Sequence, residues 1–210
     1  KLASEKGGLE KEVAGLRQRE DDRQKISQSL RANFTKAGVN ADINSRTGEV
    51  TIHFGDEYFD YGSSRLKDGM QNILQKALPV YADTLFRDRK IADRISSVEI
   101  VGFASPTYNG EYVNPKDLSP GARNAVNYNM DLSYRRAKSI FEYVFDTKKM
   151  RYPHQNTLFQ TTKVAGHSYL RSKGVDDINL NRKLSDDEYC EKYDCTKSQK
   201  VLIKFNFAER

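Results

Sequence analysis

The chain has 210 residues, of which 37% are hydrophobic, 10% aromatic and 30% charged, and its net charge is +6. The aromatic content excludes an intrinsically disordered chain, and no apolar run reaches the roughly 18 residues that predict a membrane-spanning helix. The positive charge is typical of proteins with acidic partners (nucleic acid, anionic lipid or an acidic polymer) and equally of basic proteins that are merely soluble.

Residues 1–36 have the pattern of one long helix. One heptad position holds leucines interrupted by an arginine: Leu2, Leu9, Leu16, Arg23 and Leu30. So broken a seam predicts a weak coiled coil, either a stalk that pairs with a second copy or a solvated helix laid on the domain. Gly38 should end this helix. We therefore divide the chain into a helical stalk or linker, residues 1–38, and a domain, residues 39–210.

The domain shows alternating strand and helix patterns. The domain should begin with a hairpin that has a Thr47-Gly48 turn and a second arm at 50–54, followed by a helix at 66–86 that is kinked or broken at Pro79. A strand at 97–103, a polar stretch at 104–131 and a helix at 133–146 come next. The last elements are a strand at 157–166, a polar excursion at 167–198 and a strand at 200–207. The predicted fold class is α/β, an α+β sandwich of β-α-β-α-β-β order with one mixed sheet and helices on one face.

Two arginines, Arg135 and Arg136, fall in the first turn of the helix that we expect to begin at Ser133. That is the wrong end for a cation, because the helix dipole places partial positive charge there. Ser133 would be a good N-cap, and an arginine beside free N–H groups makes sense where an anion also binds. The alternative is a surface ion pair with Asp131 or Glu142.

Two cysteines, Cys190 and Cys195, lie in the short polar stretch YCEKYDC. Their spacing favours a small disulfide and hence an oxidising compartment; the alternative is a pair of reduced thiols. A single C-x4-C pair is a weak zinc signal, and no histidine stands at ligand spacing from it. We therefore expect neither a metal nor a cofactor.

One segment carries a recognisable motif. NMDLSYRRA, residues 129–137, resembles the N-x-x-L-S-x-x-R-A signature of the OmpA/MotB-like peptidoglycan-binding domain. Three other segments agree with that family: FDYGSSRL at 59–66 stands for F-x-x-G-S-x-x-L, GFAS at 102–105 for G-[HYF]-[TA]-D, and SQKVLI at 198–203 for N-R-R-V-x-I. The resemblance covers about residues 45–208 and implies the mixed sheet described above.

The resemblance also implies a ligand. In that family the signature arginine takes a carboxylate of diaminopimelate in the stem peptide of the cell wall, and the aspartate of the G-[HYF]-[TA]-D element takes the ammonium. Arg136 would thus be an exposed carboxylate clamp, and Ser133 would cap the helix whose amides face the ligand. The expected peptidoglycan-binding residues are Ala104, Ser105, Tyr128, Asn129, Leu132, Ser133 and Arg136.

The chain departs from the family at the aspartate, whose place is taken by Ser105. Either Glu111 or Asp117, from a loop that looks longer than usual, replaces the missing acid, or the ammonium is not recognised. The terminal asparagine and first arginine of N-R-R-V are also replaced, by Ser198 and Gln199. Three tyrosines of the long loop could either pack it or form a ligand platform: Tyr108, Tyr112 and Tyr128.

The long helix before the domain resembles the periplasmic part of a MotB-type stator subunit. The enlarged loops and lost aspartate are more similar to the MotB-like subunits of anti-phage stator systems of the Zorya type. The resemblance implies a homodimer that binds peptidoglycan from the periplasm. It also implies a MotA-like channel partner, reached through an inner-membrane segment upstream of this chain, which begins KLASEK without a methionine.

The expected function is therefore non-catalytic anchoring of an ion-driven complex to the cell wall. One alternative is an OmpA-family envelope anchor without a motor, as in a lipoprotein or the tail of a porin. The other is a basic nucleic-acid-binding module, which the scattered basic residues and the cysteine pair disfavour. No nucleophile or paired carboxylates stand at a spacing that supports an enzyme.

Overall fold

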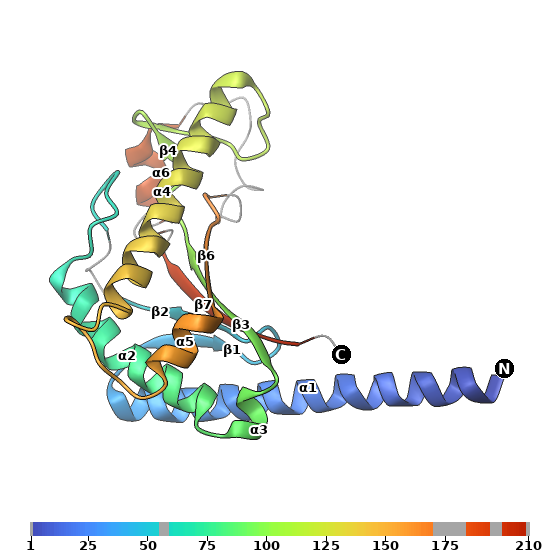
Figure 1. The fold of residues 1–210 in the computed structure, drawn as a ribbon. Coiled ribbons are helices and arrows are strands. Elements are labelled where there is room, and N and C mark those ends of the chain that lie inside the picture. The colour runs from blue at the N-terminus through green and yellow to red at the C-terminus, as the bar shows by residue number, and fades with distance from the viewer. Residues whose placement is uncertain (1, 55–58, 170–183, 194–198, 209–210) are drawn as a thin grey trace.

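The computed structural model describes residues 2–54, 59–169, 184–193 and 199–208 (Figure 1). The elements are α1 (Leu2–Ala37), β1 (Ala41–Asn44), β2 (Glu49–Ile52), α2 (Asp68–Phe86), α3 (Arg89–Ala92), β3 (Ile95–Gly102), β4 (Thr107–Tyr108), β5 (Glu111–Tyr112), α4 (Pro120–Val144), α5 (Gln155–Thr161), β6 (Thr162–Gly166), α6 (Asp186–Tyr193) and β7 (Val201–Phe207).

One five-stranded sheet has the order β1-β2-β7-β3-β6. All its pairings are antiparallel except that of β3 with β6, which the crossover through α4 and α5 joins in parallel. Alternate apolar residues of the inner strands are buried against α2, α4 and α5, among them Val50, Ile52, Val98, Ile100, Ile203 and Phe205. The expected mixed sheet with helices packed on it is confirmed.

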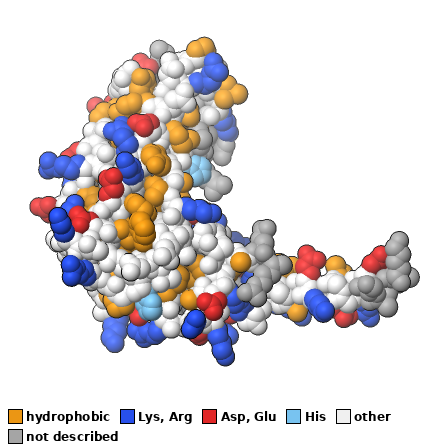
Figure 2. Space-filling view, in the orientation of Figure 1, with side chains coloured by type: hydrophobic (Ala, Val, Ile, Leu, Met, Phe, Trp, Pro, Cys, Tyr) orange, Lys and Arg blue, Asp and Glu red, His pale blue; other side chains and the backbone are white. Residues whose placement is uncertain are grey.

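The helix α1 has two different halves. Ile26, Leu30 and Phe34 are buried in the same core as the sheet, and an ion pair between buried Asp22 and Arg94 fixes this half to the domain. The N-terminal half extends away from the domain (Figures 1 and 2). The helix ends at Gly38, as expected: Gly38 has a φ of 68°, and the next N–H donates to the carbonyl of Phe34 at 2.9 Å.

The strands at the hairpin, at β3 and at β7 lie where the sequence predicts them, and so does α2, which continues through Pro79 without a break. Two other expectations are wrong. The stretch at 104–131 is not a loop, because it holds the β4–β5 hairpin and the first half of α4. The first part of the strand expected at 157–166 is the helix α5, whose Leu158 packs into the core.

The start of α4 is the correction that matters for the site. The Ser119 hydroxyl accepts the N–H of Ala122 at 3.3 Å, and Pro120 stands at the first helical position, where a missing N–H costs nothing. The helix therefore begins well before Ser133. Ser133, Arg135 and Arg136 lie in its middle, so Ser133 is not an N-cap and neither arginine meets the positive end of the dipole.

None of the helices in the part of the chain that the structure describes is long and apolar enough to cross a membrane.

Candidate functional site

The middle of α4 lies close against the ends of the parallel strands β3 and β6. Each strand ends in a glycine, and there is no room for a side chain at either. A Cβ on Gly102 would stand 2.1 Å from the carbonyl oxygen of Ser133, and a Cβ on Gly166 would stand 2.7 Å from that of Met130. The two glycines thus set the distance between helix and sheet, and place Arg136 over the end of β3.

Arg136 is buried, with 2% of its surface exposed. Its guanidinium donates to three backbone carbonyls: Nε to Ser63 at 2.9 Å, Nη1 to Phe103 at 3.3 Å and Nη2 to Asp60 at 3.2 Å. The guanidinium carbon also lies 4.9 Å from the centre of the Phe59 ring. Arg136 therefore joins the loop before α2 to the end of β3, and the expectation that it is exposed is wrong.

The charge of Arg136 has no carboxylate partner among the residues that the structure describes. Burial lowers the pKa of its guanidinium to about 10; Tyr128 opposes this shift, and the neighbouring cation Arg135 adds to it. The group remains protonated at neutral pH. A buried charge without a counter-charge typically costs several kcal/mol, so this cation is a strong candidate for an anionic ligand.

A small cavity of about 10 Å³ adjoins the guanidinium, with room for about one water molecule. It is lined by Tyr61, Gly62, Ser105, Thr107, Tyr128, Asn129, Leu132, Arg136 and Gln199. Among the lining residues that the structure describes, Arg136 alone carries a charge, and the polar ones offer hydroxyl and amide groups. Tyr61 and Tyr128, 67% and 39% exposed, stand at the mouth of the cavity.

No protein-family model matches the chain. Over 149 residues the chain is 30% identical to the Zorya protein ZorB of Escherichia coli, with 69% of this chain and 58% of ZorB aligned. The chain thus spans a little more than half the length of this curated relative. A MotB-like protein from Desulfovibrio vulgaris matches the structure with a TM-score of 0.50 at 14% identity, over 92% of this chain and 96% of that chain. The domain is OmpA/MotB-like.

The OmpA-like domain of FopA1 from Francisella tularensis gives a looser likeness, with a TM-score of 0.41 at 18% identity over 81% of this chain and 83% of that chain. The match to the Desulfovibrio vulgaris protein concerns the fold alone. The site residues of this OmpA/MotB-like domain are therefore identified from its own contacts.

Five of the seven residues that the sequence predicts for the site line the cavity: Ser105, Tyr128, Asn129, Leu132 and Arg136. Ala104 does not, since it is buried and its N–H donates to the carbonyl of Ser168. Ser133 does not either. Its hydroxyl donates to the carbonyl of Met130 at 2.8 Å and accepts the N–H of Ser168 at 2.9 Å, so it ties α4 to the segment after β6.

Asn129 has a supporting role. Its side-chain amide donates to the carbonyls of Thr107 and Ala125 at 3.1 Å each, which fixes the β4–β5 hairpin against α4. Of the three loop tyrosines, Tyr112 is buried and stacks on Tyr189 with ring centres 4.7 Å apart. Tyr108 packs on Tyr128 at 5.3 Å, so it supports the mouth of the cavity.

Neither acid proposed to replace the missing aspartate lines the cavity. Glu111 is exposed on β5, and a carboxylate oxygen of Asp117 accepts the N–H of Ser119 at 2.8 Å. The surface ion pair expected for one arginine belongs to Arg135, whose Nε lies 2.8 Å from Asp131. Four lining residues are missing from the sequence-based site: Tyr61, Gly62, Thr107 and Gln199. Two of them lie in family motifs, Gly62 in FDYGSSRL and Gln199 in SQKVLI.

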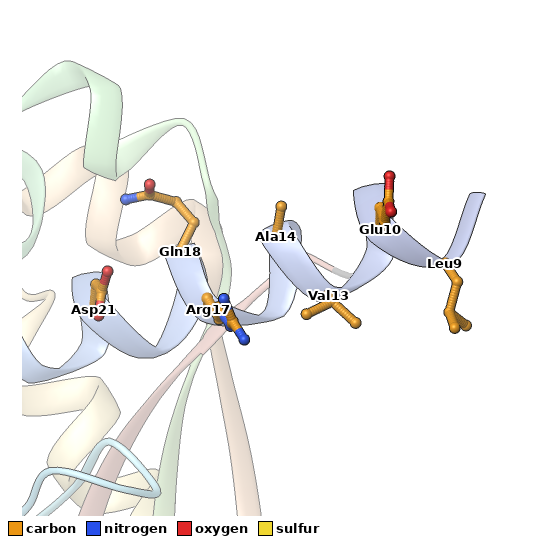
Figure 3. A pocket seen from close by; sticks show the side chains of 7 residues that line it. All are labelled: Leu9, Glu10, Val13, Ala14, Arg17, Gln18 and Asp21. Carbon is orange, nitrogen blue, oxygen red and sulfur yellow. The ribbon is translucent and has the colours of Figure 1, made fainter. Parts of the chain in front are cut away.

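A larger hollow of about 510 Å³ lies along the protruding half of α1 (Figure 3). Its lining residues are Leu9, Glu10, Val13, Ala14, Arg17, Gln18 and Asp21, all from this one helix. Because no second element among the described residues faces them, we interpret this hollow as an open helix face and not as a ligand site of the domain.

Cys190 lies in α6, and Cys195 lies outside the described residues, so the disulfide between them stays a prediction. The described residues contain no cluster of histidine, cysteine and acidic side chains that could hold a metal ion.

Proposed function

We propose that this OmpA/MotB-like domain binds peptidoglycan without catalysing a reaction, and that it anchors a MotB-like stator subunit to the cell wall. The observation that carries the proposal is the buried guanidinium of Arg136. It borders a cavity, and its hydrogen-bond acceptors among the described residues are all neutral carbonyls. A guanidinium has five N–H donors. One N–H on each terminal nitrogen is left without an acceptor among the described residues.

A carboxylate satisfies both needs of this group. It accepts charge-assisted hydrogen bonds from the two remaining N–H donors, and it neutralises the buried charge. The stem peptides of the cell wall are a dense source of carboxylates. Basic and acidic side chains are interspersed over the visible face of the molecule (Figure 2), which supports recognition at a defined site rather than attraction by one basic patch.

The relatives support a proposal for the setting of the anchor. ZorB is named as a Zorya protein, and the solved structure of similar fold is named as MotB-like. We extend this to a periplasmic location, an inner-membrane segment upstream, a MotA-like channel partner and a part in anti-phage defence. A disulfide between Cys190 and Cys195 would suit that compartment.

Co-sedimentation with purified peptidoglycan sacculi at low and high salt tests the proposal. We expect the chain to pellet with sacculi at both salt concentrations, because a buried pair is screened much less than surface charges. Soluble diaminopimelate-containing stem peptide should release it. Pelleting that disappears at high salt, or that the stem peptide does not reduce, would contradict recognition at this cavity.

We also propose that the protruding half of α1 pairs with a second copy. Leu9, Val13 and Leu16 are 64%, 40% and 52% exposed and follow the four-and-three spacing of a coiled-coil seam. Figure 3 shows the first two on the protruding part of the helix. Light scattering at high concentration should show a dimer. Leu9→Glu with Leu16→Glu should give monomers of unchanged stability, because these side chains leave the domain untouched. Lys11→Ala is the control, because Lys11 is exposed and is not among the residues that line this helix face, so this variant should stay dimeric. A monomeric wild type would contradict the seam.

A further inference from the structure

We propose that the cavity recognises a carboxylate whose neighbouring amino group is acylated, and therefore prefers cross-linked stem peptides to those with a free ammonium. The inference rests on the proposed function, namely that the ligand is a wall peptide, and it specifies which chemical form of that peptide binds.

The first argument is charge. Among the described residues, the lining of the cavity contains a buried cation, Arg136, and no carboxylate. Ser105, which stands where the family has its aspartate, is buried, and its hydroxyl oxygen lies 3.5 Å from Nε2 of Gln199. The nearby Asp60 directs its carboxylate to Lys67 at 2.9 Å. A ligand ammonium would thus enter a site of its own sign with no described acid to offset it.

The second argument is an unpaired acceptor. Gln199 is 9% exposed, and its side-chain oxygen is buried without a hydrogen-bond partner among the described residues. A buried acceptor left unsatisfied is unfavourable, so a ligand that donates one N–H to it gains affinity. The N–H of an amide supplies this one donor without a charge. An ammonium instead needs an anion to balance its charge.

The chemistry of the wall provides such a group. Forming a cross-link acylates the amino group of the diamino acid and removes its charge, while the carboxylate on the same carbon remains. The carboxylate would then meet Arg136, and the amide N–H would meet Gln199, since both residues line one cavity. The exposed side chains of Tyr61 and Tyr128 must turn outward to admit them, as exposed side chains do within nanoseconds.

Calorimetric titration of the full chain with two probes tests this inference: diaminopimelate with both amines free, and the same compound with one amine acetylated. We expect the acetylated probe to bind at least tenfold more tightly. Ser105→Asp should reverse the order, because an acid now meets the ammonium. Ser105→Asn, similar in size and neutral, should keep the wild-type order. Gln199→Glu adds an acid at the same cavity and should also favour the free amine.

Two outcomes would overturn the inference. One is equal or tighter binding of the free diamino acid by the wild type, and the other is an unchanged order in both acidic variants. Pelleting with sacculi distinguishes these from failure of the proposed function. A chain that pellets with sacculi but prefers the free amine has the proposed function and lacks this selectivity, whereas a chain that never pellets lacks the function itself.

Discussion

Replacing Arg136 with alanine is expected to abolish sedimentation with sacculi and also to lower the free energy of unfolding by about 3 kcal/mol. The loss of binding follows from the loss of the buried cation. The loss of stability follows because the carbonyls of Asp60, Ser63 and Phe103 lose their common donor. The substitution is therefore not neutral for the fold, as it would be if the guanidinium were exposed.

Two further variants separate binding from folding. Arg136→Lys keeps the charge but loses the planar group that reaches three carbonyls. We therefore expect a smaller loss of stability than in Arg136→Ala. Binding to sacculi should weaken at least tenfold, which corresponds to about 1.4 kcal/mol of binding free energy. Arg135→Ala is the control. Its ion pair with Asp131 lies on the surface and is worth at most about 1 kcal/mol, so stability and binding should be unchanged.

The measurements are urea unfolding followed by circular dichroism, and pelleting with sacculi under conditions in which each variant is folded. If a folded Arg136→Ala chain pelleted as the wild type does, Arg136 would not be a peptidoglycan-binding residue. Equal losses of pelleting in Arg135→Ala and Arg136→Ala would show that binding to sacculi depends on general positive charge and not on the buried guanidinium.

Much of the fold could be predicted because its signals are local. The long helix ends at Gly38, the hairpin turns at Thr47-Gly48, and β3 and β7 are short apolar runs with few competing patterns. The first half of α4 could not, because its exposed polar residues resemble a loop; the Ser119-Pro120 pair was the available signal. The segment of α5 contains two threonines and one phenylalanine, whose strand preference the tertiary packing overrides.

The site shows the same division. The motif led to Arg136, Asn129 and Leu132, which do line the cavity. The role given to Ser133 was wrong because it depended on the predicted start of the helix. The burial of Arg136 was missed because its acceptors are backbone carbonyls, two of them more than 70 positions earlier in the chain. Every residue has a backbone carbonyl, so residue identities do not reveal which carbonyls accept hydrogen bonds from an arginine.

Gly102→Ala should lower the free energy of unfolding by about 3 kcal/mol, at the upper end of what overpacking usually costs. The new Cβ would lie 2.1 Å from a backbone oxygen of α4, which cannot turn aside as a side chain could. Gly121→Ala, on the exposed first turn of the same helix, is the matched control. A Cβ there meets nothing within 4 Å, so stability should stay the same or rise by up to about 1 kcal/mol.

The same variant tests whether fold and site depend on each other. The oxygen that would collide with the new Cβ belongs to Ser133. Ser133 lies about one turn before Arg136 on the same helix, α4. Any shift of α4 that relieves the collision moves the guanidinium away from the carbonyl of Phe103, the residue next to Gly102. Gly102→Ala should therefore lower both the free energy of unfolding measured in urea and the fraction of protein that pellets with sacculi. Wild-type behaviour in both would mean that α4 does not rest on the end of β3, and the site would have to be sought elsewhere.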